Sequence, residues 1–137
     1  MKLVPVSLAV FYEYNNQTLK LWVQTREDDG PYHGFLEFPG GGIEIDESPL
    51  AAAVREVEEE VGIVINPDHA KFMGTYTNEL ANRTILLYVF LFPKLQTLEE
   101  KGQWVEIRSP ELSQPLRGMI PTPNHRIIDE LFLALQS

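Results

Sequence analysis

The segment between residues 48 and 62 constrains the fold most strongly, because it has every mark of a helix and strand-like runs flank it. Ser48 is a favoured N-cap residue, Pro49 suits the first helical position, and Gly62 favours a stop. The apolar residues between them recur every three or four positions, as one buried helix face requires. They are Leu50, Val54, Val57 and Val61. The sequence therefore predicts one amphipathic helix in the first half of the chain.

Runs of apolar, β-branched and aromatic residues surround this helix and predict strands. Those before it cover residues 4–14, 19–24 and 35–38, with a turn at Asn15 and Asn16. Those after it cover residues 71–79, 83–92 and 104–107, with a turn at Ala81 and Asn82, and residues 124–135 predict a second helix. Strands before, between and after two helices indicate the α/β class, with a mixed sheet between helices in an α/β/α sandwich.

Length and composition are those of an ordinary folded protein. The 137 residues are close to the size of one domain, so we expect a single domain over residues 1–137. The chain has no cysteine, so it can form neither disulfides nor thiolate metal sites, and a reducing cytoplasm fits. No stretch approaches the ~20 apolar residues of a membrane span, so we expect a soluble, cytoplasmic protein with no membrane partner.

The charge balance bears on the partner. Eleven basic against 20 acidic residues give a net charge of −9. Proteins that wrap a nucleic-acid polymer are normally basic, so we expect no such polymer as partner. A small phosphorylated ligand stays compatible if metal ions supply the compensating charge.

Three glutamates, Glu56, Glu59 and Glu60, share one face of the predicted helix. Like charges at these spacings repel, so the face is either a solvated acidic surface or a cation site. The glycines at positions 40–42 just before the helix predict a turn where backbone can approach a metal ion or phosphate closely. Carboxylates without cysteine or a histidine pair suit a hard ion such as Mg²⁺ or Mn²⁺.

The spacing of these residues resembles the signature of the Nudix hydrolases. Gly41 is followed after five residues by Glu47, and after seven more by Arg55-Glu56-Val57-Glu58-Glu59-Glu60-Val61-Gly62-Ile63. This is similar to the family pattern of Gly, five residues, Glu, seven residues, then Arg-Glu-apolar-any-Glu-Glu-any-Gly-apolar, and all nine specified positions agree. The resemblance implies a sheet between helices and metal-dependent hydrolysis of a nucleoside diphosphate linked to another group.

The resemblance also implies roles for single residues. Glu56, Glu59 and Glu60 match the family's metal ligands, and the carbonyl of Gly40 matches a backbone ligand. Arg55 matches the arginine that orients these ligands, and Glu47 is the partner with which it would pair.

The resemblance also implies a further carboxylate in the loop before the strand at 104–107. Glu99 and Glu100 both qualify, and Glu100 is preferred. Either Glu56 or Glu100 would accept the proton of the attacking water, and the sequence does not choose between them.

The run Leu36-Glu37-Phe38-Pro39-Gly40-Gly41 resembles the one that precedes this signature in the MutT-like branch, whose members cleave oxidised guanine nucleoside triphosphates. The resemblance implies substrate contacts from a set of residues in and around that run. They are Arg26, Glu37, Phe38, Gly40, Arg83 and Asn124.

Asn124 has two interpretations of equal weight. It matches the asparagine that reads the purine edge, and an amide offers both the donor and the acceptor that this edge needs. It is equally a good N-cap for the second helix. The histidine expected on the loop before the signature aligns with Pro31, and His33 lies two residues on, while His69 and His125 are expected at the surface.

The expected reaction is attack of a metal-bound water on a phosphorus of the polyphosphate, releasing pyrophosphate and a nucleoside monophosphate. The sequence leaves open which phosphorus is attacked and whether the protein is a monomer or a homodimer. The alternatives are another Nudix substrate (a nucleotide sugar, a dinucleoside polyphosphate, cytidine triphosphate or an RNA 5′ end) and a non-catalytic nucleotide sensor.

Overall fold

The computed structural model describes residues 2–27, 30, 33–95, 98, 102–108 and 116–136. The chain forms two compact units, of which the first comprises residues 1–11 and 38–97 and the second residues 12–37 and 98–137. Strand β1 (Lys2–Asn15) contributes its first part to one unit and its last part to the other. In the part of the chain that the structure describes, no helix is long and apolar enough to span a membrane.

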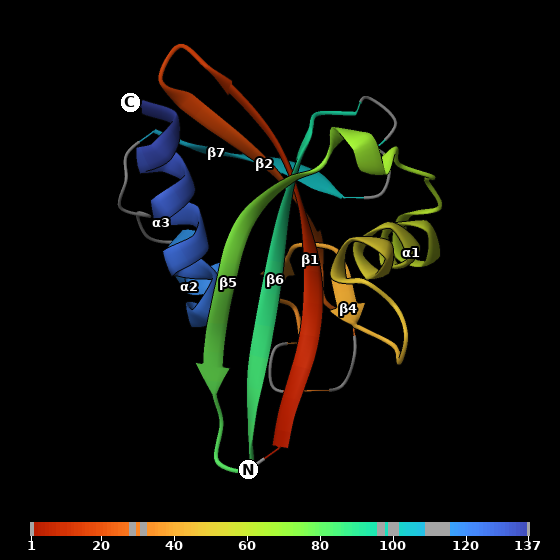
Figure 1. Ribbon diagram of the computed structural model, residues 1–137. Helices are drawn as coiled ribbons and strands as arrows, with labels where there is room; N and C mark the ends of the chain where they lie inside the picture. Colours follow the sequence, from red (N-terminus) through yellow and green to blue (C-terminus); the bar gives the residue numbers. More distant parts are fainter. Residues whose placement is uncertain are drawn as a thin grey trace. The chain divides into compact units, whose positions relative to one another are not determined.

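In the first unit, β1 pairs antiparallel with β4 (Gly40–Gly42), and the strand order runs from β1 to β6 (Arg83–Pro93) and then β5 (Lys71–Glu79). Strands β5 and β6 form an antiparallel hairpin. Helix α1 (Pro49–Val61) contacts β4 and β6, and the short 3₁₀ helix η1 (Pro67–His69) follows it. Figure 1 shows α1 lying beside β4.

The expected glycine turn before α1 is wrong, because these three residues form strand β4. Gly42, Gly41 and Gly40 pair with residues 6 to 8 of β1. Glycine is required at the last of these pairings, since a Cβ on Gly40 would collide with the backbone oxygen of Ser7. The turn interpretation missed this pairing because its partner lies more than 30 residues away in sequence.

Helix α1 begins and ends where the sequence predicts. The Ser48 side chain accepts a hydrogen bond from the Ala51 N–H at 3.1 Å, and Gly62 closes the helix with a left-handed φ of 80°. The expected buried face is correct only in part, because Val57 and Val61 are buried whereas Leu50 and Val54 are half-buried. The remaining buried positions are alanines, Ala52 and Ala53.

In the second unit, β2 (Thr18–Thr25) pairs antiparallel with the end of β1, with β3 (Leu36–Glu37) and with β7 (Gln103–Ile107). Helices α2 (Leu116–Met119) and α3 (Thr122–Gln136) complete this unit. Helix α2 was not predicted, because four residues are too few to show a periodic pattern.

The turn from β1 to β2 lies one residue later than expected. Asn16 and Gln17 both have left-handed φ values, 52° and 63°, as a tight hairpin turn requires. Tyr14 at the end of β1 contacts Phe132 of α3 edge-on, with ring centroids 6.2 Å apart. The alternation of strands and helices confirms the α/β class.

Candidate active site

The guanidinium of Arg55 connects α1 to the segment that precedes it. Its Nε donates to Glu47 Oε2 at 2.7 Å, and its Nη2 donates to Glu47 Oε1 and to the Gly42 carbonyl, both at 2.9 Å. Its Nη1 donates to Glu56 Oε1 at 3.0 Å and to Glu59 Oε2 at 3.3 Å. The pair expected between Arg55 and Glu47 is therefore present, in the two-bond geometry that fixes both side chains.

A turn holds Glu47 in place for this contact. The Glu47 N–H donates to the Glu44 carbonyl at 3.1 Å, and the Glu44 N–H donates to Glu47 Oε1 at 3.0 Å. Asp46 occupies the left-handed region with φ 66°, which aspartate tolerates better than most residues. The hydrogen bond from Arg55 and that from Glu44 lower the pKa of Glu47 to about 2, and the bond to Glu47 raises the pKa of Arg55.

The lowered pKa of Glu47 predicts that the stability of the fold depends on pH. The pKa of Glu47 is lower in the folded protein, about 2, than its ordinary value of 4.5, so the carboxylate stabilises the fold above that ordinary value. The contribution is lost as the pH falls through the folded pKa. We expect the wild type to melt at a higher temperature than Glu47→Gln near neutral pH, and the difference to vanish towards about pH 2. A difference in melting temperature that stays the same in acid would show that the ionised Glu47 carboxylate does not stabilise the fold.

Two carboxylates of α1 lie against β4. Glu60 Oε2 accepts a hydrogen bond from the Gly40 N–H at 2.9 Å. A Cβ on Gly41 would lie 2.5 Å from the carboxylate carbon of Glu56, so only glycine allows Glu56 to lie so close to the strand. The β4 backbone thus gathers two of the three glutamates on the predicted acidic face.

Ser7 positions the helix and was not predicted. It is fully buried, and its hydroxyl donates to the Pro49 carbonyl at 2.6 Å, which ties the first turn of α1 to β1. Ser7 is the one polar residue in the otherwise apolar run at 4–11, and this is the signal that could have indicated its role.

The candidate ligand atoms are of the chemical type that a hard divalent cation prefers. Glu56, Glu59, Glu60 and the Gly40 carbonyl offer oxygen ligands only. Among the described residues, no three carboxylate or imidazole groups converge into a ready-made ligand set. In this arrangement Arg55 binds Glu56 and Glu59, while Glu60 accepts from the Gly40 N–H.

The residues expected to contact substrate are divided between the two units. Arg26 and Glu37 belong to the second unit, where their side chains form an ion pair at 3.5 Å. Phe38 belongs to the first unit and is a core residue, only 4% exposed. Arg83 begins β6 in the same unit, with an exposed side chain. Glu99, Glu100 and Pro31 lie outside the described residues.

The N-cap interpretation of Asn124 is wrong, because α3 already begins at Thr122. The Asn124 N–H donates to the Pro121 carbonyl at 2.9 Å, so its backbone lies within the first turn, and its side chain is half-buried. The surface interpretation of His125 is also wrong, since its ring is half-buried and hydrogen-bonded on both nitrogens. His69 and His33 are exposed, as expected for His69.

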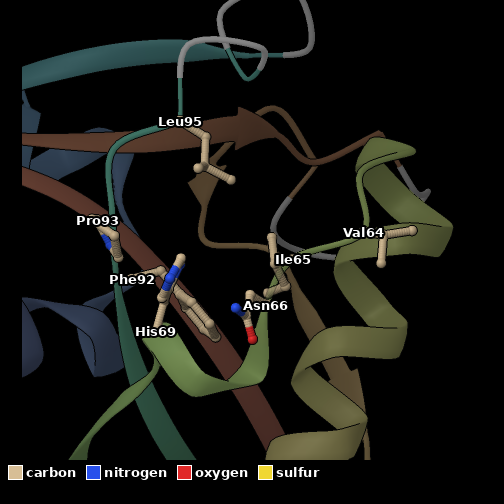
Figure 2. A pocket seen from close by; sticks show the side chains of 7 residues that line it. All are labelled: Val64, Ile65, Asn66, His69, Phe92, Pro93 and Leu95. Atoms are coloured by element: carbon tan, nitrogen blue, oxygen red, sulfur yellow. The ribbon is translucent and has the colours of Figure 1, made fainter.

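A pocket of about 230 Å³ lies in the first unit, lined by other residues than the glutamates of α1. Figure 2 shows Ile65 and Asn66, from the segment after α1, and Phe92, from the end of β6, around it. Val64, Pro93, Leu95 and His69 complete its lining. The lining is mostly apolar and contains no carboxylate or arginine, so it does not suit a metal-bound polyphosphate.

Comparison with known proteins gives one consistent result. The NUDIX domain profile matches residues 3–129. The chain is 30% identical over 112 residues to the 8-oxo-dGTP diphosphatase of Escherichia coli (strain K12). This alignment covers 78% of this chain and 83% of that protein. The chain is also 30% identical over 93 residues to the CTP pyrophosphohydrolase of the same organism, covering 68% and 64%. The solution structure of the E. coli ORF135 protein matches with a TM-score of 0.68 and 28% identity, over 100% of this chain and 93% of that one.

Proposed function

Since this chain belongs to the Nudix family and is a pyrophosphohydrolase, we propose that it hydrolyses a nucleoside triphosphate of the 8-oxo-dGTP or dGTP kind to the monophosphate and pyrophosphate, using a divalent metal. The observation that carries the proposal is the set of bonds from Arg55 to Glu47, Glu56 and Glu59 beside β4. The similarity to 8-oxo-dGTP diphosphatase along most of both chains supports the substrate class. We further propose one catalytic domain over residues 1–137, which the match over residues 3–129 supports.

Glu56, Glu59, Glu60 and the carbonyl of Gly40 would hold Mg²⁺ or Mn²⁺. When bound, the metal supplies Lewis acidity, lowers the pKa of a water and offsets the charge that develops on the phosphate oxygens. Arg55 orients Glu56 and Glu59 through bonds to both, while Glu47 and the Gly42 carbonyl hold Arg55 in turn. One carboxylate, Glu56 or Glu100, accepts the proton of the attacking water.

The remaining proposed residues bind the nucleotide. Arg26 and Arg83 supply positive charge for its phosphates or sugar, against the net charge of −9 of the whole chain. The amide of Asn124 pairs with the purine edge as donor and acceptor. Glu37 and Phe38 precede β4, and Gly40 is its first residue.

A second candidate substrate is cytidine triphosphate, because a CTP pyrophosphohydrolase is similar to this chain over 93 residues. A panel of 8-oxo-dGTP, dGTP and CTP, with pyrophosphate release as readout, decides between the two.

We expect the highest kcat/KM for 8-oxo-dGTP and no turnover in excess chelator. The melting transition should remain in chelator, since no thiolate metal site supports the fold. Turnover in chelator would refute the metal assignment, and a preference for CTP would refute the base assignment.

Asn124→Ala tests the base assignment directly. Removing the amide leaves the purine edge without its partner, so KM for 8-oxo-dGTP and dGTP should rise roughly five- to 150-fold, and KM for CTP far less. Asn124 does not cap α3, so the melting temperature should change little. Thr122→Ala, an exposed substitution in the same helical turn, is the control. An equal loss for all three nucleotides would count against base recognition by Asn124.

A further inference from the structure

The corner between α2 and α3 holds a chain of hydrogen bonds that the proposed reaction does not use. Arg117 of α2 donates from Nη1 to His125 Nδ1 at 3.0 Å and from Nη2 to Asp129 Oδ2 at 3.2 Å. On the other side of the ring, His125 Nε2 lies 2.8 Å from the Ile120 carbonyl oxygen. One imidazole therefore joins α2, the connecting residues and the first turns of α3.

These partners define the protonation state of the ring. A guanidinium has only donors, so His125 Nδ1 must accept the bond from Arg117. A carbonyl oxygen has only lone pairs, so His125 Nε2 must carry the hydrogen that points to Ile120. Both bonds exist together only in the neutral Nε2–H tautomer. In this form the His125 ring accepts a hydrogen bond on one side and donates one on the other.

The hydrogen-bonded residues Arg117 and His125 lie before and after the segment that leads into Asn124. The two residues before α3, Ile120 and Pro121, are buried, and the Asn124 N–H donates to the Pro121 carbonyl. His125 follows Asn124 directly in sequence. Adjacent helical residues differ in direction by about 100°, so the bonds of the His125 ring set the rotation of the first turn and hence the direction of Asn124.

The core does not require this ring. Helix α3 is anchored by an apolar set that lies further along it: Ile127, Ile128, Leu131 and Phe132, each no more than 2% exposed. Loss of the His125 bonds should therefore loosen the first turn while the rest of α3 stays folded.

We propose that His125, held as the neutral Nε2–H tautomer between Arg117 and the Ile120 carbonyl, is the positioning residue that directs Asn124 at the base. The proposal rests on the base-reading role given to Asn124 under the proposed function. It assigns a specificity role to three residues, Arg117, His125 and Asp129, which act through Asn124.

The tautomer is tested first, on the unmodified protein. The ¹⁵N spectrum of the His125 imidazole near pH 8 should show a protonated Nε2 and a bare Nδ1, and Arg117→Gln should reduce this preference. A predominant Nδ1–H form would overturn the proposal, because it cannot accept from Arg117.

Kinetics test the positioning role. His125→Phe keeps a ring of similar size but removes both hydrogen bonds. It should raise KM for 8-oxo-dGTP and dGTP roughly two- to thirtyfold, while kcat for these nucleotides and KM for CTP change little. The double variant with Asn124→Ala should be no worse than Asn124→Ala alone, since both act on one contact. His125→Asn, whose Oδ1 can accept from Arg117, should recover part of the loss. Arg126→Gln, at an exposed neighbouring position, is the control.

The two variants distinguish the positioning role of His125 from the base-reading role of Asn124. A change in base ranking for Asn124→Ala but not for His125→Phe would overturn the positioning role alone, as would a fall in melting temperature with the ranking intact. No change in ranking for Asn124→Ala would overturn the base assignment of the proposed function, and the positioning role with it.

Discussion

Glu60→Gln is expected to lower kcat/KM by about a hundredfold or more, while the fold keeps or gains stability. Glutamine retains an amide oxygen that can accept the bond from the Gly40 N–H at 2.9 Å, so the contact between α1 and β4 survives. The charge is lost, and with it one proposed anionic metal ligand; even outer partners of metal ligands cost about 10–100-fold when replaced. Repulsion from Glu56 and Glu59 falls at the same time.

Glu58→Gln is the matched control for this variant. Glu58 lies on the same helix, is exposed, and loses the same charge, but it does not belong to the acidic face formed by the other three glutamates. The two variants should therefore differ in kcat/KM, while both stay folded. Normal turnover by Glu60→Gln, or equal losses in both variants, would refute the ligand assignment.

The features that the sequence predicts correctly are those that depend on neighbours in the chain. The bounds of α1 follow from Ser48, Pro49 and Gly62, whose conformational preferences are local. Strand β5 has the predicted bounds, since β-branched and aromatic residues favour it without reference to its partner. The pair between Arg55 and Glu47 was predicted from the fixed spacing of the family signature.

The features that it misses depend on contacts that no local pattern of residues shows. Three consecutive glycines indicate a turn unless the pairing of β4 with β1 is known. The role of Ser7 depends on Pro49, 42 residues later. His125 has no metal-ligand spacing and was therefore expected at the surface, although Arg117 and Ile120 surround its ring. In the first two cases a contact between residues far apart in sequence overrides the local preference, whereas the contacts of His125 come from the bend between α2 and α3.

Glycine at position 41 offers the sharpest test of how β4 sets the site. A Cβ there would lie 2.5 Å from Glu56 Oε1 and 2.7 Å from Oε2, so in Gly41→Ala the carboxylate must move. The displaced group is the end of a flexible side chain, so the effect on folding should be small. Its bond from Arg55 Nη1, at 3.0 Å, would be lost with the movement.

We therefore expect Gly41→Ala to lower kcat/KM by roughly ten- to a hundredfold, as loss of the support around a metal ligand does, with a melting temperature within a few degrees of the wild type. Gly42→Ala is the matched control, because a Cβ on Gly42 meets nothing within 4 Å. Its carbonyl can still accept from Arg55 Nη2, so activity should stay within about twofold of the wild type. Raising the metal concentration should restore part of the activity of Gly41→Ala if displacement of Glu56 weakens metal binding. Equal activity of the two alanine variants would show that the contact between Glu56 and β4 does not matter for turnover, and the close approach of α1 to that strand would then serve packing alone.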